Sequence, residues 1–256
     1  MTTPPEFARI KLSRVGAVAV VTLASDKVNS LDVEVLGELT ACVGYLEQDP
    51  GTDALVVTGE GSIFSAGVNV TEVLGNDPSY TAALLDSLHQ TLVAIFRCPL
   101  PTVVAINGAA IAGGCLLACA FDRRLIAEGA RMGVTELKVG VSFPTVAVEL
   151  LRHVSGPRAE QLVFGAGLLP ADEACEVGLA HECLPPAELL AAAMVSAERL
   201  ASFDAQAYAL AKTSFRRSAL TAMEDQVGRT LDRQVSEHWQ DDQTRANLEQ
   251  LLKPKA

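Results

Sequence analysis

The feature that most restricts the fold is an uncharged stretch from Val103 to Phe121 (VVAINGAAIAGGCLLACAF). It is about as long as a membrane-spanning helix. However, three glycines and Asn107 interrupt it, Pro101 precedes it, and its β-branched residues come before its helix-forming residues. We therefore expect a buried strand, a glycine turn and a buried helix, enclosed by layers on both sides, and no membrane span.

Apolar runs at residues 17–23 and 54–59 indicate further buried strands, and a shorter strand is expected at 10–12. Helical patterns follow Asp32 and span 82–96, so strands and helices alternate to about residue 170, as in α/β proteins. After Pro170 the chain is rich in Ala, Leu, Glu, Gln and Arg, which predicts an all-helical C-terminal third with helices at 171–177, 186–201, 205–220 and 224–252. We expect a core domain at 1–195 and a helical oligomerisation region at 196–256.

The net charge of the chain excludes one class of binding partner. Twenty Lys and Arg face 31 Asp and Glu, a net charge of −11 that argues against nucleic acid, because nucleic-acid binding depends on neutralising phosphates. The six cysteines form no C-x-x-C pair, and the segment MTTPPE has no features of a secretory leader, so we expect reduced thiols in a cytoplasmic protein. The four histidines are scattered, which predicts no metal site.

The spacing of glycine and serine residues excludes two catalytic or binding motifs. Gly59, Gly61 and Gly67 follow a strand but do not have the G-x-G-x-x-G spacing of a dinucleotide site. Ser65 has Ile63 where the nucleophile elbow G-x-S-x-G requires its first glycine.

Two glycine turns are more informative. Ala66-Gly67-Val68 and Ala112-Gly113-Gly114 each follow a strand pattern and precede a helix, where backbone N–H groups lack partners and attract negative charge. Each turn alone is explained by close packing of a helix on a strand. If the fold brings both together, their N–H groups form an oxyanion hole, in which one donor is worth about a hundredfold or more in rate.

The motifs FSAGV and NGAAIAGG resemble those of the enoyl-CoA hydratase/isomerase (crotonase) superfamily. The resemblance also covers VAVVTLASDKVNSLD, FDRRLIAEGARMGVTELKVGV and LLPADEACEVGLAHECLPPAEL, and so most of the chain. It implies an α/β fold, a crotonase-like spiral of ββα units with a helical C-terminal trimerisation region. It also implies acyl-CoA thioester substrates, a homotrimer or dimer of trimers, and no cofactor, because coenzyme A is part of the substrate.

Position by position, the resemblance makes the amides of Val68 and Gly113 the oxyanion donors. It places the adenine against the loop that carries Ala66. It makes Lys27 a candidate for the coenzyme A phosphates, with Lys212, contributed by the same or the adjacent subunit, as the weaker second candidate. For either lysine, a solvated surface charge is the alternative. The sequence departs from the family pattern at Ala112, where the first glycine of GGG is expected, and at Asn69, where Asp is frequent.

The carboxylates discriminate among the family's reactions. Hydratases of the family use two glutamates, and Leu116 stands at the first of these positions, within the acyl-binding part of the site, while Glu136 stands at the second. A lone base suits a 1,3-proton shift. The resemblance to mitochondrial-type Δ3,Δ2-enoyl-CoA isomerases therefore predicts an isomerase of fatty acid β-oxidation. A hydratase that recruits another acid and a catalytically weak acyl-CoA binder stay open, as does a solvated, helix-start role for Glu136.

Overall fold

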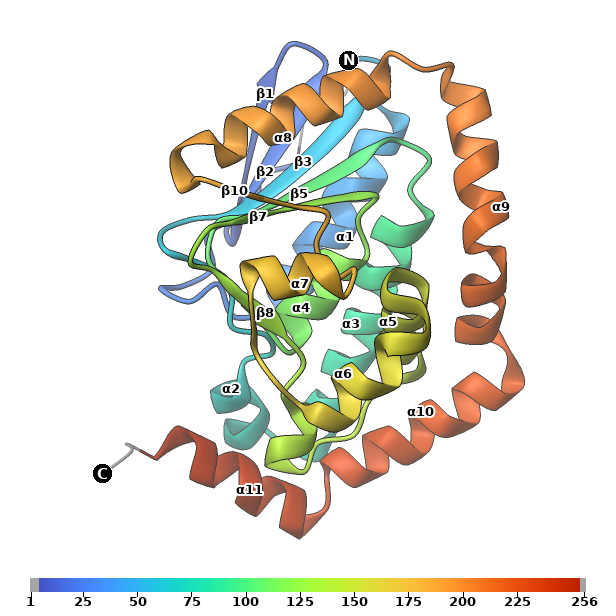
Figure 1. The fold of residues 1–256 in the computed structure, drawn as a ribbon. Helices are drawn as coiled ribbons and strands as arrows, with labels where there is room; N and C mark the ends of the chain where they lie inside the picture. The colour runs from blue at the N-terminus through green and yellow to red at the C-terminus, as the bar shows by residue number, and fades with distance from the viewer. Residues whose placement is uncertain (1–4, 254–256) are drawn as a thin grey trace.

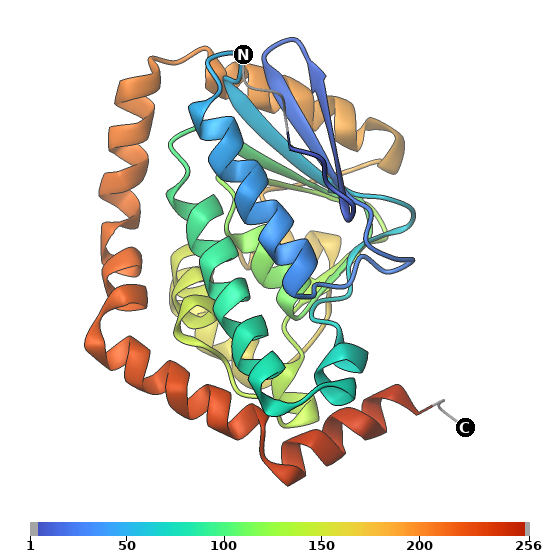
Figure 2. The ribbon, with the colours of Figure 1, turned by 180° about the vertical axis from the view of Figure 1, so that it is seen from behind.

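The computed structural model describes residues 5–253, and its framework is a six-stranded sheet covered by helices on both faces (Figures 1 and 2). β1 pairs antiparallel with β2, and every other neighbouring pair of this sheet is parallel. In spatial order its strands are β1 (Ile10–Val15), β2 (Val18–Leu23), β3 (Ala54–Gly59), β5 (Thr102–Ile106), β7 (Arg123–Ala127) and β10 (Glu182–Leu184).

A second, smaller sheet lies beside the first. β4 pairs in parallel with β6, β6 pairs in parallel with β8, and β8 pairs antiparallel with β9. In spatial order its strands are β4 (Ile63–Ser65), β6 (Ala109–Ile111), β8 (Arg131–Gly133) and β9 (Leu169–Pro170). Each pair β3–β4, β5–β6 and β7–β8 contributes one strand to each sheet before a helical segment follows. This is the spiral of ββα units that the sequence predicted.

The helices form two layers and an outer arm. α1 packs against α3 on one face of the large sheet, and α8 packs across β3, β5 and β7 on the other. The helices are α1 (Val33–Gln48), α2 (Val70–Gly75), α3 (Pro78–Arg97), α4 (Gly113–Cys119), α5 (Thr145–Ser155), α6 (Ala159–Gly165), α7 (Ala171–Glu176), α8 (Pro186–Ala201), α9 (Ala205–Glu224), α10 (Gln226–Trp239) and α11 (Asp242–Leu252). Two short 3₁₀ helices, η1 (Glu136–Val139) and η2 (Gly156–Arg158), join β8, α5 and α6.

The uncharged stretch from Val103 to Phe121 is enclosed as expected. It contains most of β5, the short strand β6 and all of α4, and nearly all of its side chains are buried. Apolar residues on both faces of β5 fit a parallel strand covered on both sides. In the part of the chain that the structure describes, no helix is long and apolar enough to span a membrane.

The C-terminal third corrects two expectations. It is not all helical, because residues 182–184 form β10, which extends the large sheet beside β7. The helix expected over 224–252 is two helices, because the side chain of Asp241 accepts a hydrogen bond from the N–H of Thr244 and so starts α11 as a new N-cap. α8 spans the expected boundary at residue 195 and packs on the sheet, and the helices α9, α10 and α11 follow it.

A buried carboxylate fastens this arm to the core. Asp122, just before β7, accepts hydrogen bonds from the Lys212 ammonium at 2.8 Å and the Arg216 guanidinium at 2.7 Å, both from α9. The hydroxyl of Tyr208 and the N–H of Thr102 also donate to it. One carboxylate therefore compensates two buried cations, and burial without a partner would be costly for each.

Replacing Asp122 by Asn should lower the free energy of unfolding by about 3–5 kcal/mol, because Lys212 and Arg216 lose the negative charge that compensates them. Denaturant unfolding followed by circular dichroism measures the change. Asp53→Asn, an exposed aspartate, is the matched control and should change stability little. Equal stability of the two variants would contradict this role for Asp122.

Candidate active site

Three segments singled out by the sequence leave the same edge of the small sheet. Residues 66–68 follow β4, residues 112–113 follow β6, and residues 134–136 follow β8. The three strands are neighbours and run in parallel, so their carboxyl ends lie side by side. Adjacent strands are about 4.8 Å apart. The two glycine turns and the segment that leads to Glu136 are therefore brought together.

Glycine allows the two turns to approach. Gly67 has φ +89°, and a Cβ atom there would lie 2.8 Å from the carbonyl oxygen of Ile111. A Cβ atom on Gly114 would lie 2.4 Å from the carbonyl oxygen of Ser65. Contacts this short do not occur for real side chains, so each turn needs its glycine in order to reach the other.

The approach brings the backbone amides of Val68 and Gly113 close together. An ideal Cβ atom built on Gly113 would lie 3.4 Å from the nitrogen of Val68, which shows how close the two amides are. Gly113 is the first residue of α4, where an N–H has no acceptor within the helix. Among residues 5–253, neither N–H donates a hydrogen bond to a protein acceptor. Two such donors suit a carbonyl oxygen that gains negative charge.

The loop before α1 supports the first turn. Leu31 forms a parallel bridge with Val68, donating to the carbonyl of Gly67 at 2.8 Å and accepting from Asn69 at 2.8 Å. The N–H of Ala66 donates to the carbonyl of Val28 at 3.0 Å. Residues 28–31 therefore run alongside residues 66–69, which explains why the motif VNSLD accompanies FSAGV in the sequence.

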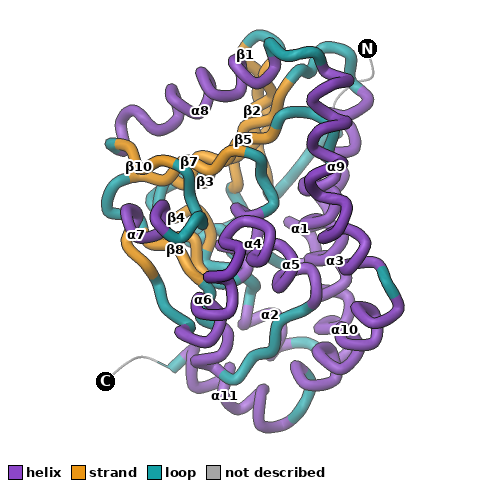
Figure 3. The backbone as a smooth tube through the Cα atoms, turned by 45° about the vertical axis from the view of Figure 1, so that its right-hand side comes forward, coloured by secondary structure: helices purple, strands orange, loops and turns teal. Residues whose placement is uncertain are grey.

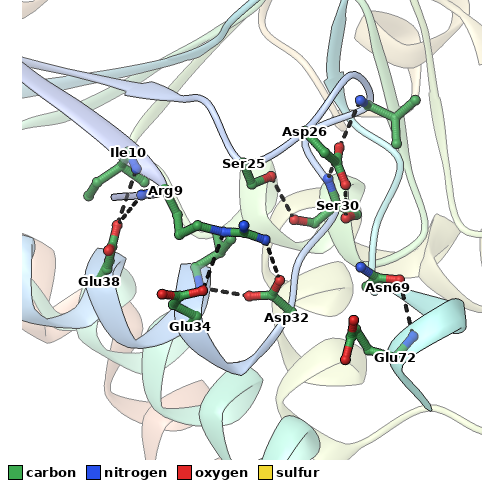
Figure 4. Close-up of polar contacts among 12 residues, drawn as sticks. Arg9, Ile10, Ser25, Asp26, Ser30, Asp32, Glu34, Glu38, Asn69 and Glu72 are labelled. Carbon is green, nitrogen blue, oxygen red and sulfur yellow. Dashed lines mark hydrogen bonds and ion pairs between the residues drawn. The ribbon is translucent and has the colours of Figure 1, made fainter. Parts of the chain in front are cut away.

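Carboxylates fix the turn that carries Lys27. The side chain of Asp26 accepts from the N–H groups of Val28 and Ser30 at 2.8 and 3.1 Å, and from the Ser30 hydroxyl (Figure 4). Arg9 pairs with Asp32 at 2.7 Å on the same loop. Lys27 is exposed next to the Ala66 turn. Its position is compatible with contact to an anionic group bound at that turn.

Glu136 is a buried carboxyl group at the start of η1. It is 8% exposed, and its Oε2 atom has no hydrogen-bond partner in the described structure. Burial raises the pKa of this carboxyl group to about 7, although the N–H groups of Glu136 and Thr135 lower the pKa in part by hydrogen bonding. The alternative of a solvated helix-start carboxylate for Glu136 is therefore wrong.

The first turn of α4 lies beside Glu136. A hydrogen bond with Cys119, burial, and then the nearby charge of Glu136 raise the pKa of the Cys115 thiol. The next residue, Leu116, is 2% exposed and offers no polar atom to a water molecule. Glu136 is thus the carboxylate near the amide pair. The apolar side chain of Leu116 occupies the position at which hydratases of the family have another glutamate.

Lys212 does not fit its expected role. Its ammonium donates to Asp122 and to the carbonyl of Leu100, and its side chain is 6% exposed. This contact lies before the amino ends of β5 and β7, away from the glycine turns at the carboxyl ends. Lys212 therefore stabilises the arm and is not available to a phosphate.

Two asparagines brace the site and were not selected from the sequence. The side-chain amide of Asn29 donates to the carbonyls of Glu60 and Ile63 at 3.0 and 2.8 Å. The side-chain oxygen of Asn107 accepts from the N–H of Gly59 at 3.0 Å. Both hold the loop between β3 and β4. The sequence carried a signal for both asparagines, because Asn29 lies in the VNSL motif and Asn107 directly follows the strand β5.

Metal ligands are not part of this arrangement. Across the residues that the structure describes, no three His, Cys, Asp or Glu side chains come together in a way that could hold a metal ion. The six cysteines are free, and four of them are buried.

Comparison with known proteins identifies the architecture. The model of the enoyl-CoA hydratase/isomerase family matches residues 13–251. The chain belongs to the enoyl-CoA hydratase/isomerase family. It is 30% identical to human mitochondrial enoyl-CoA delta isomerase 1 over 210 residues, which is 80% of this chain and 70% of the relative. It is also 30% identical to the short-chain-enoyl-CoA hydratase of Clostridium acetobutylicum over 228 residues, covering 83% and 82% of the two chains.

A solved structure of the family agrees closely with this fold. The human mitochondrial Δ3,Δ2-enoyl-CoA isomerase superposes with a TM-score of 0.90 at 27% identity, covering 96% of this chain and 97% of the other. The match includes the ββα spiral and the C-terminal helices. Relatives named hydratase are 28–39% identical and relatives named isomerase are 30–35% identical, so the family assignment alone does not select the reaction.

Ala112 departs from the family's glycine pattern at a cost. Its backbone has φ +50° and ψ −120°, a conformation that glycine adopts readily and alanine does not. Its N–H still donates to the carbonyl of Gly133 at 2.9 Å, which holds the turn in place. The turn that precedes Gly113 therefore carries backbone strain, of a kind that costs about 1–3 kcal/mol.

Replacing Ala112 by Gly should raise the free energy of unfolding by about 1 kcal/mol, because relief of the strain exceeds the entropy that glycine adds to the unfolded chain. Denaturant unfolding measures the effect. Ala222→Gly, inside helix α9 where φ is ordinary, is the control and should lower stability. A loss of stability in both variants would contradict strain at Ala112.

Proposed function

We propose that this protein is a Δ3,Δ2-enoyl-CoA isomerase that moves the double bond of a 3-enoyl-CoA to the 2-trans position. The observation that carries the proposal is a buried carboxyl group, Glu136, with one oxygen that has no hydrogen-bond partner among residues 5–253, together with two backbone amides that lie close to each other at the ends of the neighbouring strands. Leu116 occupies the position at which a hydratase would hold its other glutamate.

The reaction needs one base and one oxyanion site. Ionised Glu136 removes a proton from C2 of the 3-enoyl thioester, and the electrons move into the thioester carbonyl to give a dienolate. The amides of Val68 and Gly113 donate hydrogen bonds to the dienolate oxygen. Protonated Glu136 then returns the same proton to C4, the double bond forms between C2 and C3, and the carbonyl is restored. No water is consumed.

With the thioester carbonyl bound at the Val68 and Gly113 amides, the coenzyme A moiety and the acyl chain extend from that point in different directions. We expect the adenine end of coenzyme A against the Ala66 loop and its phosphates within reach of Lys27, with the acyl chain beside Leu116. The apolar side chains that α9 and α10 expose, including Leu210, Phe215, Val227 and Leu231, support a homotrimer or dimer of trimers built on these helices. We place this chemistry in fatty acid β-oxidation in the cytoplasm.

A hydratase is the second candidate, because the short-chain-enoyl-CoA hydratase of Clostridium acetobutylicum is as similar in sequence as the human isomerase. Adding water to a 2-enoyl thioester requires a group that orients the water and one that exchanges protons with it. The buried side chain of Leu116 can do neither. This is why the isomerase is preferred.

The purified protein should convert a 3-enoyl-CoA to the conjugated 2-enoyl-CoA, which is followed by the ultraviolet absorbance of the conjugated thioester. Glu136→Gln should lower kcat by about a hundredfold to ten-thousandfold, because glutamine cannot accept the proton. Glu128→Gln removes an exposed carboxylate at the end of β7 and serves as the matched control.

The same panel includes a 2-enoyl-CoA, whose absorbance falls on hydration. Faster hydration of the 2-enoyl-CoA than isomerisation would overturn the proposal in favour of a hydratase. Binding of acyl-CoA without turnover of either substrate would favour a binding protein. An undiminished kcat in Glu136→Gln would exclude Glu136 as the base.

The rate should depend on pH through Glu136. Only the ionised carboxylate can accept the C2 proton, and its pKa is raised to about 7. kcat/KM should therefore be constant above that value and fall about tenfold per pH unit below it. Initial rates between pH 5 and 9 give this profile. A limb with its midpoint near 4.5, the ordinary value for Glu, would mean that the working base is not buried Glu136.

A further inference from the structure

The last helix, α11, contacts both halves of the site. It packs against α2, which begins two residues after Val68, and against η1, which begins with Glu136 (Figures 1 and 3). These two elements are far apart in the sequence. α11 is therefore in a position to fix the distance between the amide donors and the base.

The contact with α2 is made by Arg245. Its guanidinium donates to the carbonyl oxygens of Val73 and Leu74 at 3.3 and 3.0 Å. α2 is only six residues long, so its final carbonyls have no partners within the helix. A cation at the C-terminal end of a helix is also favourable for the helix dipole. Arg245 thus joins the element that follows the oxyanion turn to α11.

The contact with η1 is made at Gly140, which ends the 3₁₀ helix with φ +68°. The hydroxyl of Thr244, a residue that is 2% exposed, donates to the carbonyl of Gly140 at 3.5 Å. A Cβ atom on Gly140 would lie 2.5 Å from the Nδ2 atom of Asn247. The backbone of Gly140 therefore lies directly against α11.

The helix before α11 holds the same segment. The indole N–H of Trp239 donates to the carbonyl of Ser142 at 2.9 Å, and the hydroxyl of Ser142 is 3.1 Å from Nδ1 of His238. The backbone from Glu136 to Ser142 is thus fastened to the C-terminal helices at residues 140 and 142.

Among residues 5–253, no other side chain forms a hydrogen bond or an ion pair with the carboxylate of Glu136. It accepts hydrogen bonds from the N–H groups of Glu136 and Thr135, and Oε2 has no partner in the described structure. Its direction therefore follows the backbone of η1. A displacement of about 1 Å between reacting groups can cost about a hundredfold in rate.

We propose that α11 sets the separation between Glu136 and the oxyanion amides, with Arg245 and Thr244 as positioning residues that contact neither the substrate nor the reacting atoms. The proposal rests on the proposed function in one respect, which is that Glu136 is the base. It adds that the end of the chain belongs to the scaffold of the active site.

Arg245→Ala should lower kcat about tenfold to a hundredfold with KM within about twofold, because the thioester still binds while the base moves. The acid limb of the pH profile should move from about 7 toward 4.5, because α11, once released from α2, no longer holds the backbone of η1 at Gly140, and displacement of η1 admits water to Glu136. Arg245→Lys can donate to one of the two carbonyls and should recover part of both effects. Thr244→Val should show the same changes more weakly, and Thr244→Ser should not.

Arg199→Ala is the matched control, because it removes the same charge from the exposed side of α8. A kcat and pH profile of Arg245→Ala equal to those of Arg199→Ala would overturn the proposal. So would a loss of kcat that equals the unfolded fraction measured by denaturation, with an unmoved acid limb, because that result describes a merely structural residue.

A measurement without turnover separates this proposal from the proposed function. The pKa of the Glu136 carboxyl group can be read by carbon-13 NMR of labelled glutamate, assigned by the signal lost in Glu136→Gln. If the wild-type protein fails to isomerise 3-enoyl-CoA, the proposed function fails. The role of α11 then still stands if the pKa falls in Arg245→Ala, and it fails if the pKa is unchanged.

Discussion

The parallel alignment of β4, β6 and β8 is the constraint on which the site depends. Each strand is only three residues long, and each is followed at its carboxyl end by one element of the site. The register pairs Ile111 with Gly133, and the N–H of Ala112 continues the ladder to the carbonyl of Gly133. Backbone hydrogen bonds therefore hold the start of the Gly113 turn beside the end of β8, and the large sheet and its helices keep the three strands in place.

A site built from backbone amides requires particular residues where the backbone turns approach each other, rather than at the donor residues themselves. The proposed donors are backbone amides, so their role does not depend on the side chain of Val68, whereas Gly67 and Gly114 are fixed by the space between the turns. A third position of these turns has a glycine conformation but carries another residue. Ala112 occupies a glycine conformation because the surrounding hydrogen bonds hold it.

Much of the fold followed from local pattern. The apolar runs of β2, β3 and β5 and the glycine turns predicted an α/β core, and the resemblance to a known family pointed to Val68, Gly113 and Glu136. β10 was missed because three residues carry little periodicity and gain their stability by pairing with β7. The break before α11 had a local signal, Asp241 followed by Thr244, which a continuous helical pattern concealed. The burial of Lys212 had none, because its partner Asp122 lies 90 residues away in the sequence.

The burial of Glu136 also links folding to proton uptake. The pKa is about 7 in the folded chain and 4.5 for an ordinary glutamate, so the folded state holds this proton more tightly than the unfolded state. The resulting stabilisation, about 3 kcal/mol, is fully present below pH 4.5 and is lost as the pH rises through 7. Ionisation of Glu136, which prepares it to accept a proton, therefore withdraws stability from the fold around it. The fold therefore has to keep Glu136 in place at a pH at which its ionised carboxylate is destabilising, and the backbone hydrogen bonds around Ala112, Leu31 and Gly140 contribute to that restraint.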